Sequence, residues 1–220
     1  MSGAVIQLIV LAAIAIFLIF KLKNVLGTRE GFEKPTTPLE EPIPQQAKRD
    51  FEVIEGGPDP DIVDHVDEGS TAAIALSAMK RVEPQFSVSE FLKGARGAYE
   101  MILMAFERGD IEQIKPFLSA EVYEAFEGAV AARKEQGLDV HAEFLGLREL
   151  VLSGADFDHA TNDSEITVRF GGELISVARN AQGEIVEGDP KVARKQRDIW
   201  TFARRMGSDD PNWQLVATGG

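Results

Sequence analysis

The chain begins with a long apolar run, continues through a polar, proline-rich stretch, and only then becomes periodic. Within residues 3–20 the only polar side chain is that of Gln7. A helix of these 18 residues would be about 27 Å long, close to the thickness of the hydrocarbon core of a bilayer. Basic residues follow the run from Lys21 onward, and none precedes it. We therefore expect an uncleaved transmembrane anchor over residues 1–23, with the rest of the chain on the cytoplasmic side.

The next stretch, residues 24–69, has the opposite character. Between residues 30 and 70 lie six of the ten prolines, with twelve acidic and only three basic side chains. Such a sequence buries too little apolar surface to offset the entropy lost on ordering, and its like charges repel one another. We expect an acidic, flexible linker over residues 24–69, with a short binding motif at residues 51–54 as the less favoured alternative.

Apolar residues then recur at spacings of three and four, which is typical of amphipathic helices. A short helix is expected over residues 70–81. A longer one over residues 87–109 begins with the capping box Ser87-Val88-Ser89-Glu90. Two further helices are predicted over residues 110–118 and 119–137.

After residue 137 the period changes to two, which is typical of strands. The alternating segments are residues 142–152, 164–179, 194–205 and 213–218, separated by clusters of turn-forming residues. Helices followed by strands indicate an α+β domain over residues 70–220, with the helices packed on one face of a curved antiparallel sheet. A cone of this kind leaves an apolar cavity at its mouth.

The amino-acid composition argues against several classes of function. The 220 residues carry a formal net charge of −13 and no cysteine. Residues 30–70 account for −9 of that charge, so the folded domain is only mildly acidic. Net acidity argues against nucleic-acid binding, and the lack of cysteine excludes disulfides, cysteine-ligated metals and thiol nucleophiles. The chain also contains no phosphate-binding loop, dinucleotide fingerprint or nucleophile elbow.

Two small groups of residues could carry chemistry. His141 and Glu143 are two positions apart, so in a strand they would face the same side and could form an acid–base pair. Asp156, Asp158 and His159 resemble a metal-ligand cluster, but they lie in a predicted turn, where aspartate usually bonds to local backbone. We favour solvated, structural roles for both groups, and we expect no catalytic residue, no metal and no cofactor.

A basic cluster near the end of the domain is its one strongly positive feature. Such charges can protect an exposed edge strand from aggregation. The alternative is contact with an acidic partner or with anionic lipid headgroups. The candidate surface residues are Lys191, Arg194, Lys195, Arg197, Arg204 and Arg205.

The apolar residues of the predicted long helix should face inward-pointing residues of the sheet. Apolar residues at helical spacing are usually core, and lining of a pocket is the alternative. The tryptophans are the better candidates for a role, because a buried indole N–H needs a partner. The candidate lining residues are Tyr99, Ile102, Leu103, Phe106, Phe170, Trp200 and Phe202.

Several short stretches of the domain carry a resemblance to a known family. They are residues 91–95, 99–102, 105–110, 116–119 and 121–123 in the helices, and 198–204 and 211–215 in the last strands. Together they resemble the Tim44-like domain family over residues 70–220. With the N-terminal anchor, the overall plan is similar to bacterial membrane-anchored proteins of the TimA type. The resemblance implies a cone-shaped fold like that of nuclear transport factor two, with a pocket between helices and sheet.

The resemblance also implies a function. The mitochondrial relative binds the inner membrane on its matrix side and tethers a chaperone to the import channel. We expect a non-enzymatic adaptor of the bacterial inner membrane, acting in protein transport or in membrane-complex organisation. Its expected partners are the membrane and proteins, with anionic lipid or a hydrophobic segment as alternatives, and no nucleic acid.

Two alternatives stay open. One is a small-molecule-binding protein or enzyme of the same fold, in which Asp156 or Glu143 acts as base. A carboxylate or histidine projecting into an enclosed pocket would favour that reading. The other is a periplasmic domain with inverted membrane topology.

Overall fold

The computed structural model describes residues 57–219. The predicted anchor, residues 1–23, and the linker as far as residue 56 lie outside the described residues. Among residues 57–219, no helix combines the length and the apolar character that crossing a bilayer requires.

Helices come first along the described chain, as the hydrophobic period predicts. The predicted helices at residues 70–81, 87–109 and 119–137 are confirmed, and each begins at a serine whose hydroxyl accepts a backbone N–H of the first turn. The helices are α2 (Pro60–Val63), α3 (Thr71–Val82), α4 (Val88–Arg108) and α5 (Ala120–Glu135), with a 3₁₀ segment, η1 (Ile111–Phe117), between the last two.

The segment predicted as a helix over residues 110–118 is the 3₁₀ helix η1. Two local features explain the difference. The side chain of Asp110 makes no capping hydrogen bond, and Pro116 lies inside the segment. Proline has no backbone N–H and disfavours the helical conformation of the residue before it, so a regular α-helix does not form here.

All strand pairs in the five-stranded sheet are antiparallel, and the order is β1-β2-β4-β5, with β3 paired to β2. Four of the strands match the predicted segments. The short β3 was not predicted, because all four of its residues are exposed and it shows no inside–outside alternation. The strands are β1 (Asp139–Phe157), β2 (Asp163–Arg179), β3 (Ile185–Gly188), β4 (Arg194–Arg205) and β5 (Gln214–Gly219).

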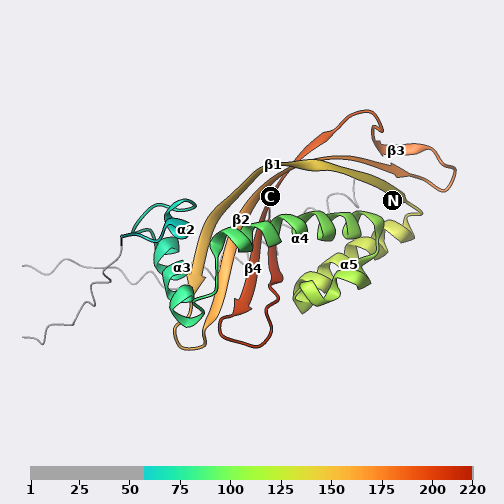
Figure 1. The fold of residues 1–220 in the computed structure, drawn as a ribbon. Coiled ribbons are helices and arrows are strands. Elements are labelled where there is room, and N and C mark those ends of the chain that lie inside the picture. The colour runs from blue at the N-terminus through green and yellow to red at the C-terminus, as the bar shows by residue number, and fades with distance from the viewer. Residues whose placement is uncertain (1–56, 220) are drawn as a thin grey trace, which may run out of the picture. The chain divides into compact units, whose positions relative to one another are not determined.

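The two longest strands, β1 and β2, curve over α4, so the helices lie on the concave side of the sheet (Figure 1). The register of β1 against β2 shifts at three places, near Gly146, Glu149 and Gly154. Such bulges bend a strand and increase its twist. The curved sheet gives the single helix α4 a large apolar surface to pack against.

The core lies between α3, α4 and η1 on one side and β1, β2, β4 and β5 on the other. Along β2, Ile166, Val168 and Phe170 are fully buried while their neighbours Glu165 and Arg169 are exposed. The helix-on-antiparallel-sheet arrangement confirms the predicted α+β class.

The end of the predicted linker differs from the expectation of a flexible tether. Residues 57–69 contain α2, whose Ile62 is only 3% exposed. The many acidic residues of this segment suggested solvation, but Asp61 bonds to the start of α4 and Asp59 to Lys80 of α3, as described next. The packed part of the chain therefore begins upstream of residue 70.

Candidate functional site

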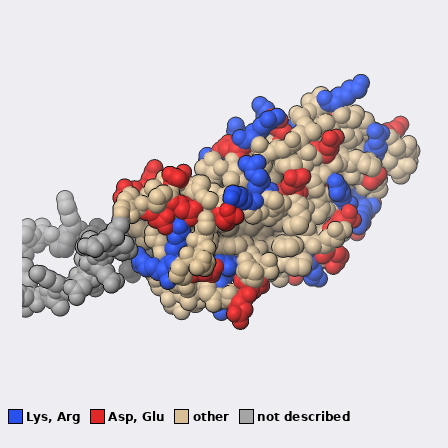
Figure 2. All heavy atoms as spheres, viewed as in Figure 1, with Lys and Arg blue, Asp and Glu red and all other residues tan. Residues whose placement is uncertain are grey.

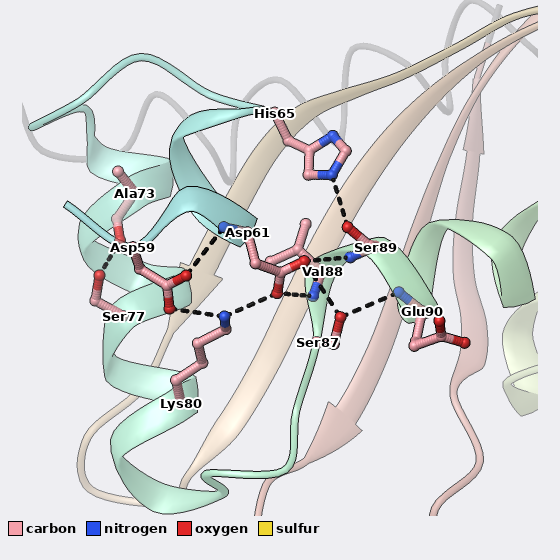
Figure 3. Close-up of polar contacts among 10 residues, drawn as sticks. All are labelled: Asp59, Asp61, His65, Ala73, Ser77, Lys80, Ser87, Val88, Ser89 and Glu90. Carbon is pink, nitrogen blue, oxygen red and sulfur yellow. Dashed lines mark hydrogen bonds and ion pairs between the residues drawn. The ribbon is translucent and has the colours of Figure 1, made fainter.

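A polar cluster joins α2 to α3 and α4 (Figure 3). The carboxylate of Asp61 accepts hydrogen bonds from the backbone N–H groups of Val88 (2.8 Å) and Ser89 (3.0 Å) at the start of α4. It also pairs with Lys80 Nζ at 2.8 Å. Burial alone would raise the pKa of Asp61, but the bonds to Lys80 and Ser89 outweigh it and hold that pKa well below its usual range.

The other polar groups of this cluster are engaged with one another. Lys80 Nζ also contacts Asp59 at 2.7 Å, and His65 Nε2 lies 3.2 Å from Ser89 Oγ. A carboxylate at a helix N-terminus satisfies backbone donors that otherwise lack partners. The hydrogen bonds and ion pairs of this cluster therefore attach α2 to α3 and α4, and we assign the cluster a structural role rather than a catalytic one.

A second polar contact lies inside the aromatic core. The ring of Tyr99 stacks on Phe170 with centroids 4.4 Å apart, and Trp200 lies 4.8 Å away. The Tyr99 hydroxyl donates to Asp198 Oδ2 at 2.5 Å, and the other carboxylate oxygen accepts from Gln196 Nε2 at 3.2 Å. Burial, together with the nearby carboxylate, raises the pKa of Tyr99 far above its ordinary value.

The structure brings the seven predicted lining residues together between α4 and the sheet. All belong to the hydrophobic core or pack against it. Ile102, Leu103, Phe106 and Trp200 also line a cavity of about 310 Å³, and Asp198 lines it too. Sequence reasoning missed Asp198, although its alternation with Trp200 and Phe202 on β4 places it on the inward face.

A larger cavity of about 410 Å³ lies along α4 between Glu90 and Ile102, and we call it the α4 pocket. Aromatic rings form its walls, small residues of α4 form its floor, and two carboxylates and one guanidinium are the charged groups that line it. Of the predicted lining residues, Ile102 and Phe202 reach it. The walls are Phe86, Phe91, Phe117 and Trp213, the floor is Gly94, Ala95 and Ala98, and the charged groups belong to Glu83, Glu90 and Arg204.

Arg204 is the most deeply placed charged group of the α4 pocket, with its side chain 7% exposed. Its Nη2 donates to Glu83 Oε1 at 2.8 Å, and its guanidinium carbon lies 5.2 Å from the Trp213 ring centroid. Burial would raise the pKa of Glu83, but the bonds from Arg204 and from the Gly207 N–H lower it overall. The Nε atom of Arg204 is buried and has no hydrogen-bond partner among the described residues.

The six predicted basic surface residues do not form one patch. Arg204 is buried in the α4 pocket, and Arg205 pairs with Asp163 at 2.9 Å. Arg194 lines cavities on the inward side of β4, whereas Lys195 and Arg197 stand at alternate positions along the strand. On the face drawn in Figure 2, Lys and Arg side chains are interspersed with Asp and Glu.

The prediction of an edge strand holds for only half of β4. Residues Ile199–Ala203 pair with β5, so this part of β4 lies inside the sheet. Within residues 57–219, the preceding part, from Arg194 to Asp198, pairs only with β2. In this part of the chain the basic residues Lys195 and Arg197 therefore lie at the edge of the sheet.

The residues considered for acid–base or metal chemistry remain at the surface. His141 Nε2 lies 3.0 Å from Asp139, and both side chains are more than two-thirds exposed. Glu143 and Asp156 are also exposed. Asp158 accepts the Ala160 N–H at 2.8 Å in the β1–β2 turn. In residues 57–219 we find no grouping of three or more His, Asp or Glu side chains that could hold a metal ion.

Comparison with known proteins shows which protein family this chain resembles. The model of the Tim44-like domain matches residues 72–220. The Homo sapiens mitochondrial import inner membrane translocase subunit TIM44 is 25% identical over 144 residues, which are 64% of this chain and 31% of that protein. The Arabidopsis thaliana subunit TIM44-1 is 24% identical over 151 residues, again covering 31% of its length. This chain thus spans less than a third of these relatives.

One solved structure shows a weak overall similarity. It is the crystal structure of the intermembrane space region of the chloroplast protein ARC6. The match covers 66% of this chain and 94% of that chain, with 14% sequence identity and a TM-score of 0.37.

Proposed function

The chain belongs to the Tim44-like domain family, and on that premise we propose that it is a membrane-anchored, non-enzymatic adaptor acting in protein transport at the bacterial inner membrane. The observation that carries the proposal is the family match over residues 72–220. The similar human and plant proteins are named as subunits of an inner membrane import translocase. In this proposal the domain binds a segment of a partner protein.

The arrangement of the described residues supports a binding role. The curved sheet covers a single long helix, α4, and residues of that helix line two cavities. The walls of the α4 pocket are largely aromatic and aliphatic, which is typical of sites that take apolar groups. We propose that this is the cone-shaped architecture of nuclear transport factor two, preceded by an anchor over residues 1–23 and by a linker that starts at residue 24 and ends before α2, as in a TimA-type protein.

The anchor is tested by carbonate extraction of bacterial membranes. We expect the full chain to stay in the membrane pellet and a chain of residues 24–220 to appear in the supernatant, because only the former carries the apolar run. A reporter fused after Gly220 should be active only in the cytoplasm. Release of the full chain by carbonate, or activity of a periplasmic reporter, would contradict the proposed anchor or its orientation.

The adaptor role is tested by cross-linking followed by purification from solubilised membranes. The full chain should recover a defined set of membrane or translocating proteins. The chain of residues 24–220 should recover less of them, because it is no longer concentrated at the membrane. If both chains recover only background proteins, the adaptor proposal loses its basis.

One observation favours a second candidate function, that of a small-molecule-binding protein or enzyme. The Asp198 carboxylate lines a cavity and bonds to Tyr99, so an acidic group does reach an interior space. Asp156 and Glu143, the bases considered from the sequence, are exposed. This candidate predicts that a metabolite mixture raises the melting temperature of the wild-type chain and not that of Asp198→Asn. Equal shifts, or none, would leave the adaptor proposal as the better account.

A further inference from the structure

The α4 pocket has the form of a site for an apolar side chain. Phe91 and Trp213 meet edge to face with centroids 4.8 Å apart, and Phe86 lies 6.0 Å from Trp213. The floor is smooth, because Gly94 has no side chain and a Cβ built on it meets nothing within 4 Å. The volume, about 410 Å³, falls within the usual range of about 300–1,000 Å³ for pockets that bind ligands.

Arg204 gives this largely apolar pocket a hydrogen-bond donor that a ligand could satisfy. The hydrogen bonds that it makes within residues 57–219 all leave from Nη2, to Glu83 and to the Met206 sulfur. Its Nε donor is buried without a partner in that same part of the chain. A buried donor without an acceptor is unfavourable, so a ligand that brings an oxygen to this end of the pocket would be bound more tightly than a plain hydrocarbon. The half-buried Trp213 ring stands against the guanidinium and would have to shift to admit that oxygen.

The charges of the pocket indicate what kind of oxygen fits. The charge of Arg204 is already balanced by Glu83, 2.8 Å away. Glu90 adds a second carboxylate to the lining, and it pairs with Lys93 at 2.5 Å. Each charged group of the lining therefore already has a counter-ion within residues 57–219. A carboxylate or phosphate would find no unpaired cation among these groups and would lie close to two carboxylates, whereas a neutral carbonyl needs only a hydrogen-bond donor.

We propose that the α4 pocket binds an apolar side chain of a partner protein's peptide segment, with a neutral backbone carbonyl of that segment accepting a hydrogen bond from Arg204. The inference rests on the proposed adaptor function and assigns its contact site. A peptide satisfies both conditions at once, because every apolar side chain is flanked by neutral carbonyl groups. A fatty acid or a phospholipid supplies the apolar chain but places an anion next to Glu83 and Glu90.

The test is a binding titration with the full chain in phospholipid nanodiscs. The probe is the blocked tripeptide acetyl-Leu-Phe-Leu-amide, and decanoate is the anionic comparison. The readout is tryptophan fluorescence, since the chain contains only two tryptophans and Trp213 lines the pocket. We expect saturable binding of the tripeptide, and at least tenfold weaker binding of decanoate.

Two matched glycines of α4 provide the variants. Gly94→Leu places a side chain in the pocket, whereas Gly97→Leu makes the same change outside it. A Cβ added at either position meets nothing within 4 Å. We expect Gly94→Leu to weaken tripeptide binding at least tenfold and Gly97→Leu to leave it unchanged. Arg204→Lys keeps a cation beside Glu83 but lacks the Nε donor, and it should weaken the tripeptide about tenfold without changing its own circular dichroism spectrum.

The outcomes separate this inference from the adaptor proposal. Tripeptide binding that Gly94→Leu does not weaken would overturn the assignment of the pocket. Decanoate binding tighter than the tripeptide and sensitive to Gly94→Leu would identify a lipid site instead. If cross-linking recovers partners equally with Gly94→Leu and Gly97→Leu, the adaptor proposal stands and the pocket assignment falls. If cross-linking recovers nothing while the titration behaves as expected, the pocket binds peptides and the adaptor proposal fails.

Discussion

Individual carboxylates stabilise this domain in three different surroundings. Asp61 accepts the first N–H groups of α4, Asp198 accepts a tyrosine hydroxyl in the core, and Glu83 balances Arg204 in the α4 pocket. In each case the acid comes from a segment remote in sequence from its donor. A hydrogen bond to a charged group is worth more than one between neutral groups, about 1.5–3 kcal/mol.

Asp61→Ala should destabilise the domain by about 1–2 kcal/mol, the usual effect of losing a carboxylate cap at a helix N-terminus. Chemical denaturation followed by circular dichroism measures the change. Asp67→Ala is the control, because Asp67 is an exposed acid of the same segment. Equal stabilities of the two variants would show that the Asp61 contacts do not stabilise the fold.

The same residue predicts a pH dependence. The pKa of Asp61 is lower in the folded chain than its ordinary value of 3.8, so the unfolded chain binds the proton more readily. This contribution to stability is complete above about pH 5 and decreases as the pH falls through about 4 toward the folded pKa. The free energy of unfolding should therefore fall less between pH 5 and 3 in Asp61→Ala than in the wild type. A steeper fall in the variant would contradict the sign.

Tyr99→Phe should lower stability by about 1–3 kcal/mol, because it leaves the inward-facing Asp198 without its phenolic donor. Tyr123→Phe is the matched control. Tyr123 also donates to a carboxylate at 2.5 Å, but its partner, Glu112, is exposed and can be rehydrated. Thermal unfolding of both variants should show the larger shift for Tyr99→Phe, and the reverse order would mean that Asp198 is hydrated in the folded chain.

At the scale of the element, α4 organises the domain. It packs under the curve of β1 and β2, and its residues line two cavities. Its start is held by the Ser87 cap and by Asp61, and its end by Gly109, whose φ of 75° is left-handed. Two glycines at exposed positions of α4, Gly94 and Gly97, lower its helix propensity.

Substitutions at two of these glycines should have opposite effects. Gly97→Ala should raise stability by about 0.5–1 kcal/mol, because alanine is the better helix former and its Cβ meets nothing within 4 Å. Gly109→Ala should lower it by about 1–2 kcal/mol, because its left-handed φ disfavours a side chain. The added Cβ would also lie 3.2 Å from Val130. Denaturant titrations measure both, and stabilisation by Gly109→Ala would contradict the assignment of its conformation.

At the scale of the whole domain, the fold extends upstream of the helices and strands that the sequence pattern predicts. Ile62 is buried in the core, and Asp61 and Asp59 pair with Lys80. The end of the linker is thus part of the packed unit. Any connection to an N-terminal anchor enters the domain at α2.

A chain of residues 57–220 should therefore be more stable than one of residues 70–220. The shorter chain loses the buried side chain of Ile62 and the cap from Asp61. Removing a buried isoleucine side chain typically lowers stability by about 2–5 kcal/mol, and loss of a cap lowers it by about 1. Calorimetry should show a clearly lower melting temperature for the shorter chain. Equal melting temperatures would mean that α2 is not part of the cooperative unit.

The helices, four of the strands and the core residues follow from local pattern. The helical spacing of apolar residues and the capping serines locate α3, α4 and α5. The alternation of apolar and polar residues locates β1, β2, β4 and β5. Both patterns arise because each element must bury one face. The seven lining candidates lie in the core or pack against it for the same reason. β3 was missed because it buries no face, and η1 differs from an α-helix because of Pro116.

Local sequence already establishes the α+β class and the inward faces of its elements, because burial of an apolar face is a property of consecutive residues. The partners of the polar side chains that stabilise the core and α4 depend on folding, since Asp61 and Val88 are 27 positions apart and Glu83 and Arg204 are 121 positions apart. Arg204, Lys195 and Arg197 belong to one basic cluster in the sequence. The pleat of β4 and the packing of the β4–β5 loop bury Arg204 in the α4 pocket, whereas Lys195 and Arg197 lie at the edge of the sheet formed by residues 57–219.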